Sequence, residues 1–104
     1  MFVPGQIIYF KLKDEVVLFG GINAEAKAVC YDTNLQIMED VDLKFTSPLV
    51  NATTDKAVIG NLVADDNYGV IVIKPEHQEY AKEQLQKYND KFKEGALKPA
   101  ERVK

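Results

Sequence analysis

The pattern of apolar and polar residues changes abruptly at Pro75. Residues 6–73 consist of short apolar runs separated by Gly, Pro, Asp and Asn, a pattern typical of strands joined by tight turns. From residue 75 onward, apolar side chains recur every three or four positions, which is typical of an amphipathic helix. The pattern therefore predicts a strand-rich segment over residues 6–73 and one helix over residues 75–94.

Two apolar runs near the N-terminus predict an antiparallel hairpin. Ile7–Phe10 and Val16–Phe19 form the strands, and Asp14 with Glu15 supplies the turn. The adjacent glycines at positions 20 and 21 are expected to end or bulge the second strand, since paired glycines in a strand mark a bend or a close backbone approach. Further strands are expected at Lys27–Tyr31, Leu35–Met38, Val41–Phe45 and Val70–Ile73.

The stretch before the last predicted strand is less regular. Residues 49–64 fit either a short helix or a strand interrupted by Gly60, and we favour the strand. Residues 65–69 have turn composition, and Gly69 suits a positive φ. The sequence thus predicts an α+β fold, with a mainly antiparallel sheet or small curved barrel of five to seven strands and one C-terminal helix packed on it.

The predicted helix has a signal at each end and one apolar stripe. Pro75 fits the first helical position, Glu79 places negative charge near the positive end of the helix dipole, and Gly95 suits the residue after the last turn. The stripe should dock on the sheet. Its members are His77, Ala81, Leu85, Tyr88 and Phe92, with Tyr80 beside them.

Length and composition bound the number of domains. A chain of 104 residues with 46% apolar residues can form one core, so we expect one domain over residues 1–95. Residues 96–104 have alternating charge and Pro99, and we predict a mobile basic tail there. With a single cysteine, no signal-peptide pattern and apolar runs of at most four residues, we expect a soluble cytoplasmic protein without membrane contact.

Charge limits the class of partner. The net charge of −3 disfavours a general affinity for nucleic acid, which depends on a dense field of Lys and Arg. Residues 82–104 carry seven basic and four acidic side chains, giving +3, and these cations also complement the helix dipole. The candidate basic contacts in this region are Lys87, Lys91, Lys98 and Arg102.

Candidate catalytic and metal-binding residues are few. Cys30 and His77 are the only thiol and imidazole, and Cys30 lies in an apolar strand where burial is expected. A calcium loop with Gly69 at its sixth position would place Ala64 first and Pro75 last, and neither can bind the ion. We therefore predict no enzyme activity, no metal and no cofactor.

The burial pattern suggests how the protein works. Several strands are apolar on both faces, so either the sheet curls and covers itself or a second copy of the chain covers it. Our leading hypothesis is a protein–protein interaction or assembly protein that self-associates through apolar strand faces or an open sheet edge. The candidate interface residues are Ile7, Tyr9, Val17 and Phe19. The alternative is a small SH3-like or OB-like barrel that binds a peptide or single-stranded nucleic acid, with Tyr9, Tyr31 and Tyr68 as stacking candidates.

Overall fold

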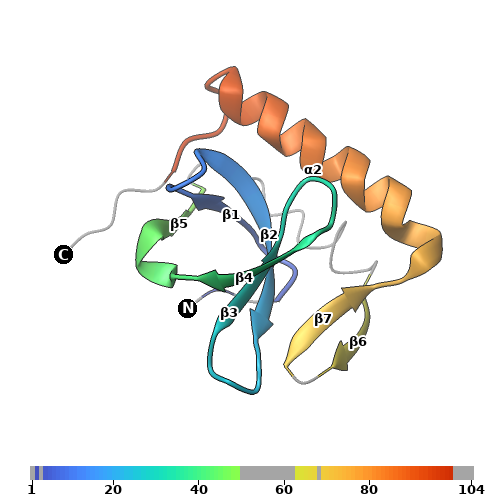
Figure 1. The fold of residues 1–104 in the computed structure, drawn as a ribbon. Helices are drawn as coiled ribbons and strands as arrows, with labels where there is room; N and C mark the ends of the chain where they lie inside the picture. The colour runs from blue at the N-terminus through green and yellow to red at the C-terminus, as the bar shows by residue number, and fades with distance from the viewer. Residues whose placement is uncertain (1, 3, 50–62, 68, 100–104) are drawn as a thin grey trace.

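The computed structural model describes residues 2, 4–49, 63–67 and 69–99 of the chain (Figure 1). These residues form an antiparallel sheet with one C-terminal helix packed on it, which confirms the predicted α+β class. The number of strands lies within the predicted range. The elements are β1 (Ile7–Phe10), β2 (Glu15–Ile22), β3 (Ala28–Tyr31), β4 (Ile37–Val41), η1 (Leu43–Phe45), β5 (Thr46–Pro48), β6 (Val63–Asn67), β7 (Val70–Ile73), η2 (Pro75–His77) and α2 (Gln78–Lys93), where η denotes a 3-10 helix.

The first four strands form a meander, and the fifth returns to the first. The order across the sheet is β4-β3-β2-β1-β5, with every pair antiparallel. The pairing of β2 with β3 shifts register between Phe19 and Gly21. At that point β7 joins β2 through the pair Gly21 and Val70, and β6 pairs with β7. The predicted bulge and close backbone approach at Gly20 and Gly21 are therefore confirmed.

The two faces of the sheet contribute to two hydrophobic cores. Successive side chains of β2 point to opposite faces, as strand geometry requires. Val16 and Leu18 lie under the helix, whereas Val17 and Phe19 lie on the other face, and each is at most 1% exposed. We call the first group the helix-side core (Val16, Leu18, Tyr31, Leu49, Ile71, Ile73, Ala81, Leu85, Leu97) and the second the far-side core (Ile8, Phe10, Val17, Phe19, Ala28, Cys30, Val41).

The chain covers the far-side core by curling its own sheet. Strands β1, β2, β3 and β4 all contribute buried side chains to this one cluster, so the sheet bends around it. Phe2, Leu43 and Phe45 pack against the same cluster. The sequence left open whether a curled sheet or a second copy covers the strands, and the curled sheet and the helix provide this cover within one chain.

The helical residues, 75–93, lie within the predicted range of 75–94. Pro75 opens the 3-10 turn η2, which continues directly into α2, and Gly95 follows the helix with a φ of +82°. Ala81 and Leu85 from the predicted stripe are fully buried against the sheet. The stripe also contains Asn89, which is 3% exposed and which the sequence did not single out.

Asn89 fastens the helix to β2 by hydrogen bonds. Its Oδ1 accepts from the backbone N–H of Val16 at 2.8 Å, and its Nδ2 donates to the carbonyl of Val16 at 2.8 Å. The ladder between β2 and β3 starts at the pair Leu18 and Tyr31, after which the chain turns away from Val16. The Asn89 amide therefore makes the two hydrogen bonds at Val16 that the strand on the β3 side would otherwise make.

One predicted strand is instead a strand end followed by a 3-10 turn. Val41 is the last residue of β4, and residues 43–45 form η1. The side chain of Asp42 accepts a hydrogen bond from the N–H of Lys44 at 3.1 Å, and its carbonyl accepts from Phe45 at 3.0 Å. The prediction of a strand over Val41–Phe45 is wrong because this capped turn also packs Leu43 and Phe45 on the far-side core.

The chain after α2 continues to pack on the domain. Leu97 is 5% exposed in the helix-side core, and Pro99 forms an antiparallel bridge with Leu49. Residues 96–99 of the predicted tail thus contact the domain, because the tail carries one apolar side chain that the core accepts. The mobility of the tail stays a prediction. Residues 100–104 lie outside the described residues.

The remaining predictions concern the region around β6. This strand extends through Asn67, which pairs with Val70, so Asp65 and Asp66 lie in a strand and not in the predicted turn. Gly69 has the expected positive φ, +82°. Most of residues 49–64 lie outside the described residues.

Among the described helices, none has the length and apolar character needed to cross a bilayer.

Candidate functional site

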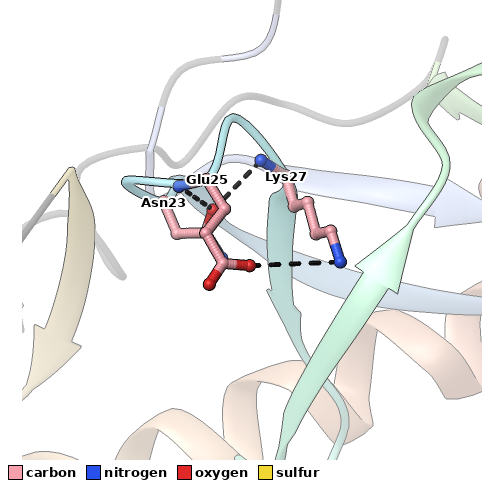
Figure 2. A network of polar contacts seen from close by, with 3 residues as sticks. All are labelled: Asn23, Glu25 and Lys27. Carbon is pink, nitrogen blue, oxygen red and sulfur yellow. Dashed lines mark hydrogen bonds and ion pairs between the residues drawn. The ribbon is translucent and has the colours of Figure 1, made fainter.

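The loop between β2 and β3 forms one wall of a hollow at the end of the sheet. The Oδ1 of Asn23 accepts hydrogen bonds from the backbone N–H of Glu25 at 2.9 Å and of Lys27 at 3.0 Å (Figure 2). The N–H of Asn23 donates to the carbonyl of Lys27 at 2.9 Å, and Ala26 has a φ of +63°. These bonds hold a tight loop, which also places the Lys27 ammonium 4.0 Å from the Glu25 carboxylate (Figure 2).

The turn between β4 and η1 forms the opposite wall. The carboxylate of Asp42 accepts from the N–H of Lys44, and its Oδ2 lies 3.3 Å from the Lys44 ammonium. The backbone hydrogen bond from Lys44, together with its charge, lowers the pKa of Asp42. Lys44 also lies 5.4 Å above the ring of Phe45. This wall therefore keeps a negative charge in a fixed place at the end of β4.

Between these walls lies a hollow of about 380 Å³, which we call the hairpin hollow. Its floor is apolar, since Ala28 and Val41 belong to the far-side core and Ile22 and Leu43 pack against it. Lys27 and Asp42 add one charge of each sign to the lining. The arrangement can accept a side chain with an apolar stem. The lining residues are Ile22, Ala26, Lys27, Ala28, Val41, Asp42 and Leu43.

Strand β4 leads from one edge of the sheet into this hollow. Among the described strands, β4 is the last in the order and pairs only with β3. The N–H of Asp32 donates to the carbonyl of Gln36, and the next pair along the ladder is Tyr31 with Ile37. Bonded and non-bonded pairs alternate in antiparallel ladders, so the N–H and C=O of Ile37 point away from β3. The Ile37 side chain is 59% exposed, and the strand ends at Val41 in the hollow.

Comparison with known proteins identifies no relative of this chain. No protein-family model matches the sequence, and neither a curated protein nor a solved structure matches it.

The four predicted interface residues occupy two kinds of environment. Val17 and Phe19 lie in the far-side core at 0% and 1% exposure, so they present no surface to a partner in this structure. Ile7 and Tyr9 are half-buried against the helix-side core. The Tyr9 ring packs on Phe92 with centroids 5.0 Å apart. None of the four lines the hairpin hollow.

The predicted stacking tyrosines have structural roles where the chain is described. Tyr31 is 7% exposed, and its hydroxyl donates to the carbonyl of Ile71, which ties β3 to β7. Burial raises the pKa of Tyr31. The hydroxyl of Tyr9 donates to Asp14 at 2.9 Å, and burial together with that carboxylate raises the pKa of Tyr9. Tyr68 lies outside the described residues.

The basic candidates do not gather at the hairpin hollow. Lys87 and Lys91 are exposed on α2, and Lys98 is exposed after it. Arg102 lies outside the described residues. Asp90 shares this part of the helix and accepts a hydrogen bond from Gln86, so the lysines alternate with acidic side chains.

The thiol and the imidazole lie in separate parts of the fold. Cys30 is fully buried in the far-side core on β3, and His77 lies at the end of η2, where the helix begins. Within the described ranges, no three His, Cys, Asp or Glu side chains are grouped to hold a metal ion.

Cys30 should therefore resist alkylation while the protein is folded. Burial raises the pKa of its thiol to about 12, and the thiolate is the reactive form. We expect no labelling by iodoacetamide at about pH 8, where a free thiol is partly ionised, and rapid labelling after denaturation. Intact-mass spectrometry of both samples measures this. Rapid labelling of the native protein would show that β3 opens readily.

Sequence reasoning named an open sheet edge as a possible interface but did not identify β4 as that edge, and it did not find the hairpin hollow. One local signal was present, because Asn23 and Asp42 are residue types that cap turns with their side chains. The hollow itself requires the end of β2 and the end of β4 to lie together, which depends on the register of three strands.

Proposed function

We propose that this chain is a non-enzymatic protein-binding module whose interaction surface is the free side of β4. A partner adds an extended segment to this edge, and one of its side chains enters the hairpin hollow. The observation that carries the proposal is the position of β4: in the described part of the chain it ends the sheet, and its last residue lines the hollow.

This mode of binding uses groups that the strand already presents. The outward N–H and C=O of Ile37 can pair with an added strand, which gives affinity through main-chain hydrogen bonds. The hollow beside Val41 supplies selectivity for a side chain, because alternate residues of an added strand face it. The same edge can receive a different protein or a second copy of this chain.

The predicted alternative of single-stranded nucleic acid has less support. Its stacking candidates Tyr9 and Tyr31 are engaged in packing and hydrogen bonds, and the net charge of the chain is −3. A binding groove for a phosphate backbone needs a positive lining, whereas the hairpin hollow has one lysine and one aspartate.

Replacing Ile37 by proline tests the proposal. Proline removes the outward N–H but no hydrogen bond to β3, and proline is tolerated on edge strands. Peptides of about nine residues, selected on the wild-type protein from a random phage-displayed library, should bind I37P at least about tenfold more weakly. Fluorescence anisotropy measures the affinity, and circular dichroism checks the fold.

The matched control is Ile37→Thr, which keeps the N–H and removes most of the exposed apolar side chain. The I37T variant should retain most of the affinity for the selected peptides. In the wild-type protein, bound peptide should slow hydrogen exchange of the Ile37 amide. Equal affinity of the selected peptides for I37P and wild type would contradict strand addition at β4.

A further inference from the structure

Strand β4 contains one more residue than its neighbour β3 over the same length of the ladder. Ile37 and Val41 are four positions apart in β4, whereas the residues opposite them, Tyr31 and Ala28, are three positions apart in β3. The pairing shifts register between Ala28 and Cys30, as it does at a β-bulge. The extra residue therefore reverses the alternation of side chains between the two ends of β4.

The two ends of β4 consequently present apolar groups on opposite faces of the sheet. Ile37 lies opposite Tyr31 of the helix-side core, and its side chain is 59% exposed. Val41 lies opposite Ala28, and both belong to the far-side core that forms the floor of the hairpin hollow. Directly opposite residues share a face of the sheet. A regular strand added to β4 passes these two places in three steps, as β3 does, so its side chains there also point to opposite faces.

The charges beside the hollow favour an uncharged side chain as its occupant. Lys27 and Asp42 are the charged residues of the described lining. The Lys27 ammonium lies 4.0 Å from the Glu25 carboxylate, and the Asp42 carboxylate lies 3.3 Å from the Lys44 ammonium. A charged side chain that entered the hollow would lose its hydration and find its counter-charge already paired, which is unfavourable. An apolar side chain instead covers the apolar floor and disturbs neither ion pair.

The described edges of a second copy do not supply a fitting segment. In the β4 strand of such a copy, Val41 is 6% exposed and Met38 packs on the far-side core, so neither side chain is available to fill a neighbour's hollow. The strand at the other end of the order, β5, consists of Thr, Ser and Pro. Strand β6 has one large apolar residue, Val63. A different protein is therefore the better occupant.

We infer that the β4 edge receives an extended segment of a different protein that carries two large apolar residues three positions apart, on opposite faces of the segment. This inference rests on the proposed function and names the chemistry of its partner. One apolar side chain packs beside Ile37 on the helix side of the sheet, and the other enters the hairpin hollow over Val41 and Leu43. A segment with apolar residues two positions apart presents both on one face, so it fills only one of these places.

Three threonine-based peptides of about nine residues test the spacing and the chemistry. The first has two leucines three positions apart, the second has them two positions apart, and the third has lysines in place of the leucines of the first. The first should bind the wild-type protein about threefold more tightly than the second, which lacks one cross-strand apolar pair. It should bind at least about tenfold more tightly than the third. Fluorescence anisotropy gives the affinities, and hydrogen exchange of the Ile37 amide shows whether each peptide binds at β4.

Replacing Ile37 by aspartate should remove the preference for the three-residue spacing. A carboxylate at this exposed position would lie beside the leucine on the helix side, and covering a charge with an apolar neighbour is unfavourable. The affinities for the first and second peptides should then become equal. The matched control is Leu12→Asp, which makes the same change at a side chain that is 64% exposed in the turn between β1 and β2. This control should leave both affinities unchanged.

The outcomes separate this inference from the proposed function. Equal affinity of the wild-type protein for the two leucine peptides, with slower exchange of the Ile37 amide in both complexes, would leave the proposed function standing and show that the spacing is wrong. Equal or tighter binding of the lysine peptide would show that the occupant of the hollow is not apolar. If the library-selected peptides slow that exchange and neither leucine peptide does, this inference alone is wrong. If no peptide slows it, both proposals fail. A stable homodimer that Ile37→Pro abolishes would make a second copy the occupant and overturn this inference.

Discussion

Replacing Asn89 by alanine should lower the free energy of unfolding by about 3 kcal/mol. The substitution leaves the N–H and the C=O of Val16 without their partners, both bonded at 2.8 Å in a site where Val16 is fully buried. An unsatisfied buried polar group costs about 1–3 kcal/mol, and the better helix propensity of alanine returns only about 0.6 kcal/mol. Urea unfolding followed by circular dichroism measures the change.

Two further variants separate this hydrogen-bonding role from general effects on the helix. Gln86→Ala removes an exposed amide from the same helix and should change stability by at most about 0.5 kcal/mol. Asn89→Asp keeps the size of the side chain but cannot donate to the Val16 carbonyl while ionised. This variant should therefore also be less stable than the wild-type protein. A loss below about 1 kcal/mol in N89A would show that the pairing with Val16 contributes little.

Replacing Gly21 by alanine should destabilise the fold by at least about 3 kcal/mol, through steric overlap and backbone strain. A β-carbon at this position would lie 2.1 Å from the carbonyl oxygen of Gly69, so β2 and β7 would have to separate. The φ of Gly21 is +134°, which an L-residue rarely adopts. Thermal and urea unfolding provide the measurement.

Gly95 offers a matched control for the backbone conformation alone. Its φ is also positive, +82°, but a β-carbon there would meet no atom within 4 Å. Gly95→Ala should therefore cost only about 1 kcal/mol, the penalty of a left-handed conformation. If G21A were no more destabilised than G95A, close packing of β2 against β7 would not be a major source of stability.

The sequence could predict elements whose signals are local. The helix has Pro75 at its start and Gly95 after its end, and both take the predicted roles. The bulge at Gly20 and Gly21 could also be predicted from the sequence, because only glycine allows such a close approach of backbones. Apolar residues on both faces of β2 likewise indicated two covered faces, which the structure has.

Features that depend on distant parts of the chain could not be predicted in this way. Alternation over Val41–Phe45 fits a strand, but the same residues also satisfy a turn capped by Asp42. Asn89 resembles a solvent-facing helix residue until its partner, Val16, is known to lie opposite. The hairpin hollow requires the register of β2, β3 and β4 together, and no short motif encodes such a register.

The division into two cores has a consequence for how the protein is synthesised. Every described member of the far-side core, and every described side chain packed against it, comes from the first forty-five residues. The helix-side core needs Leu85 and Leu97 from the far end of the sequence. Chains emerge from the ribosome N-terminus first, and nearby contacts form faster than distant ones. The curled meander can therefore begin to assemble as a nascent unit before the helix that docks on it has been synthesised.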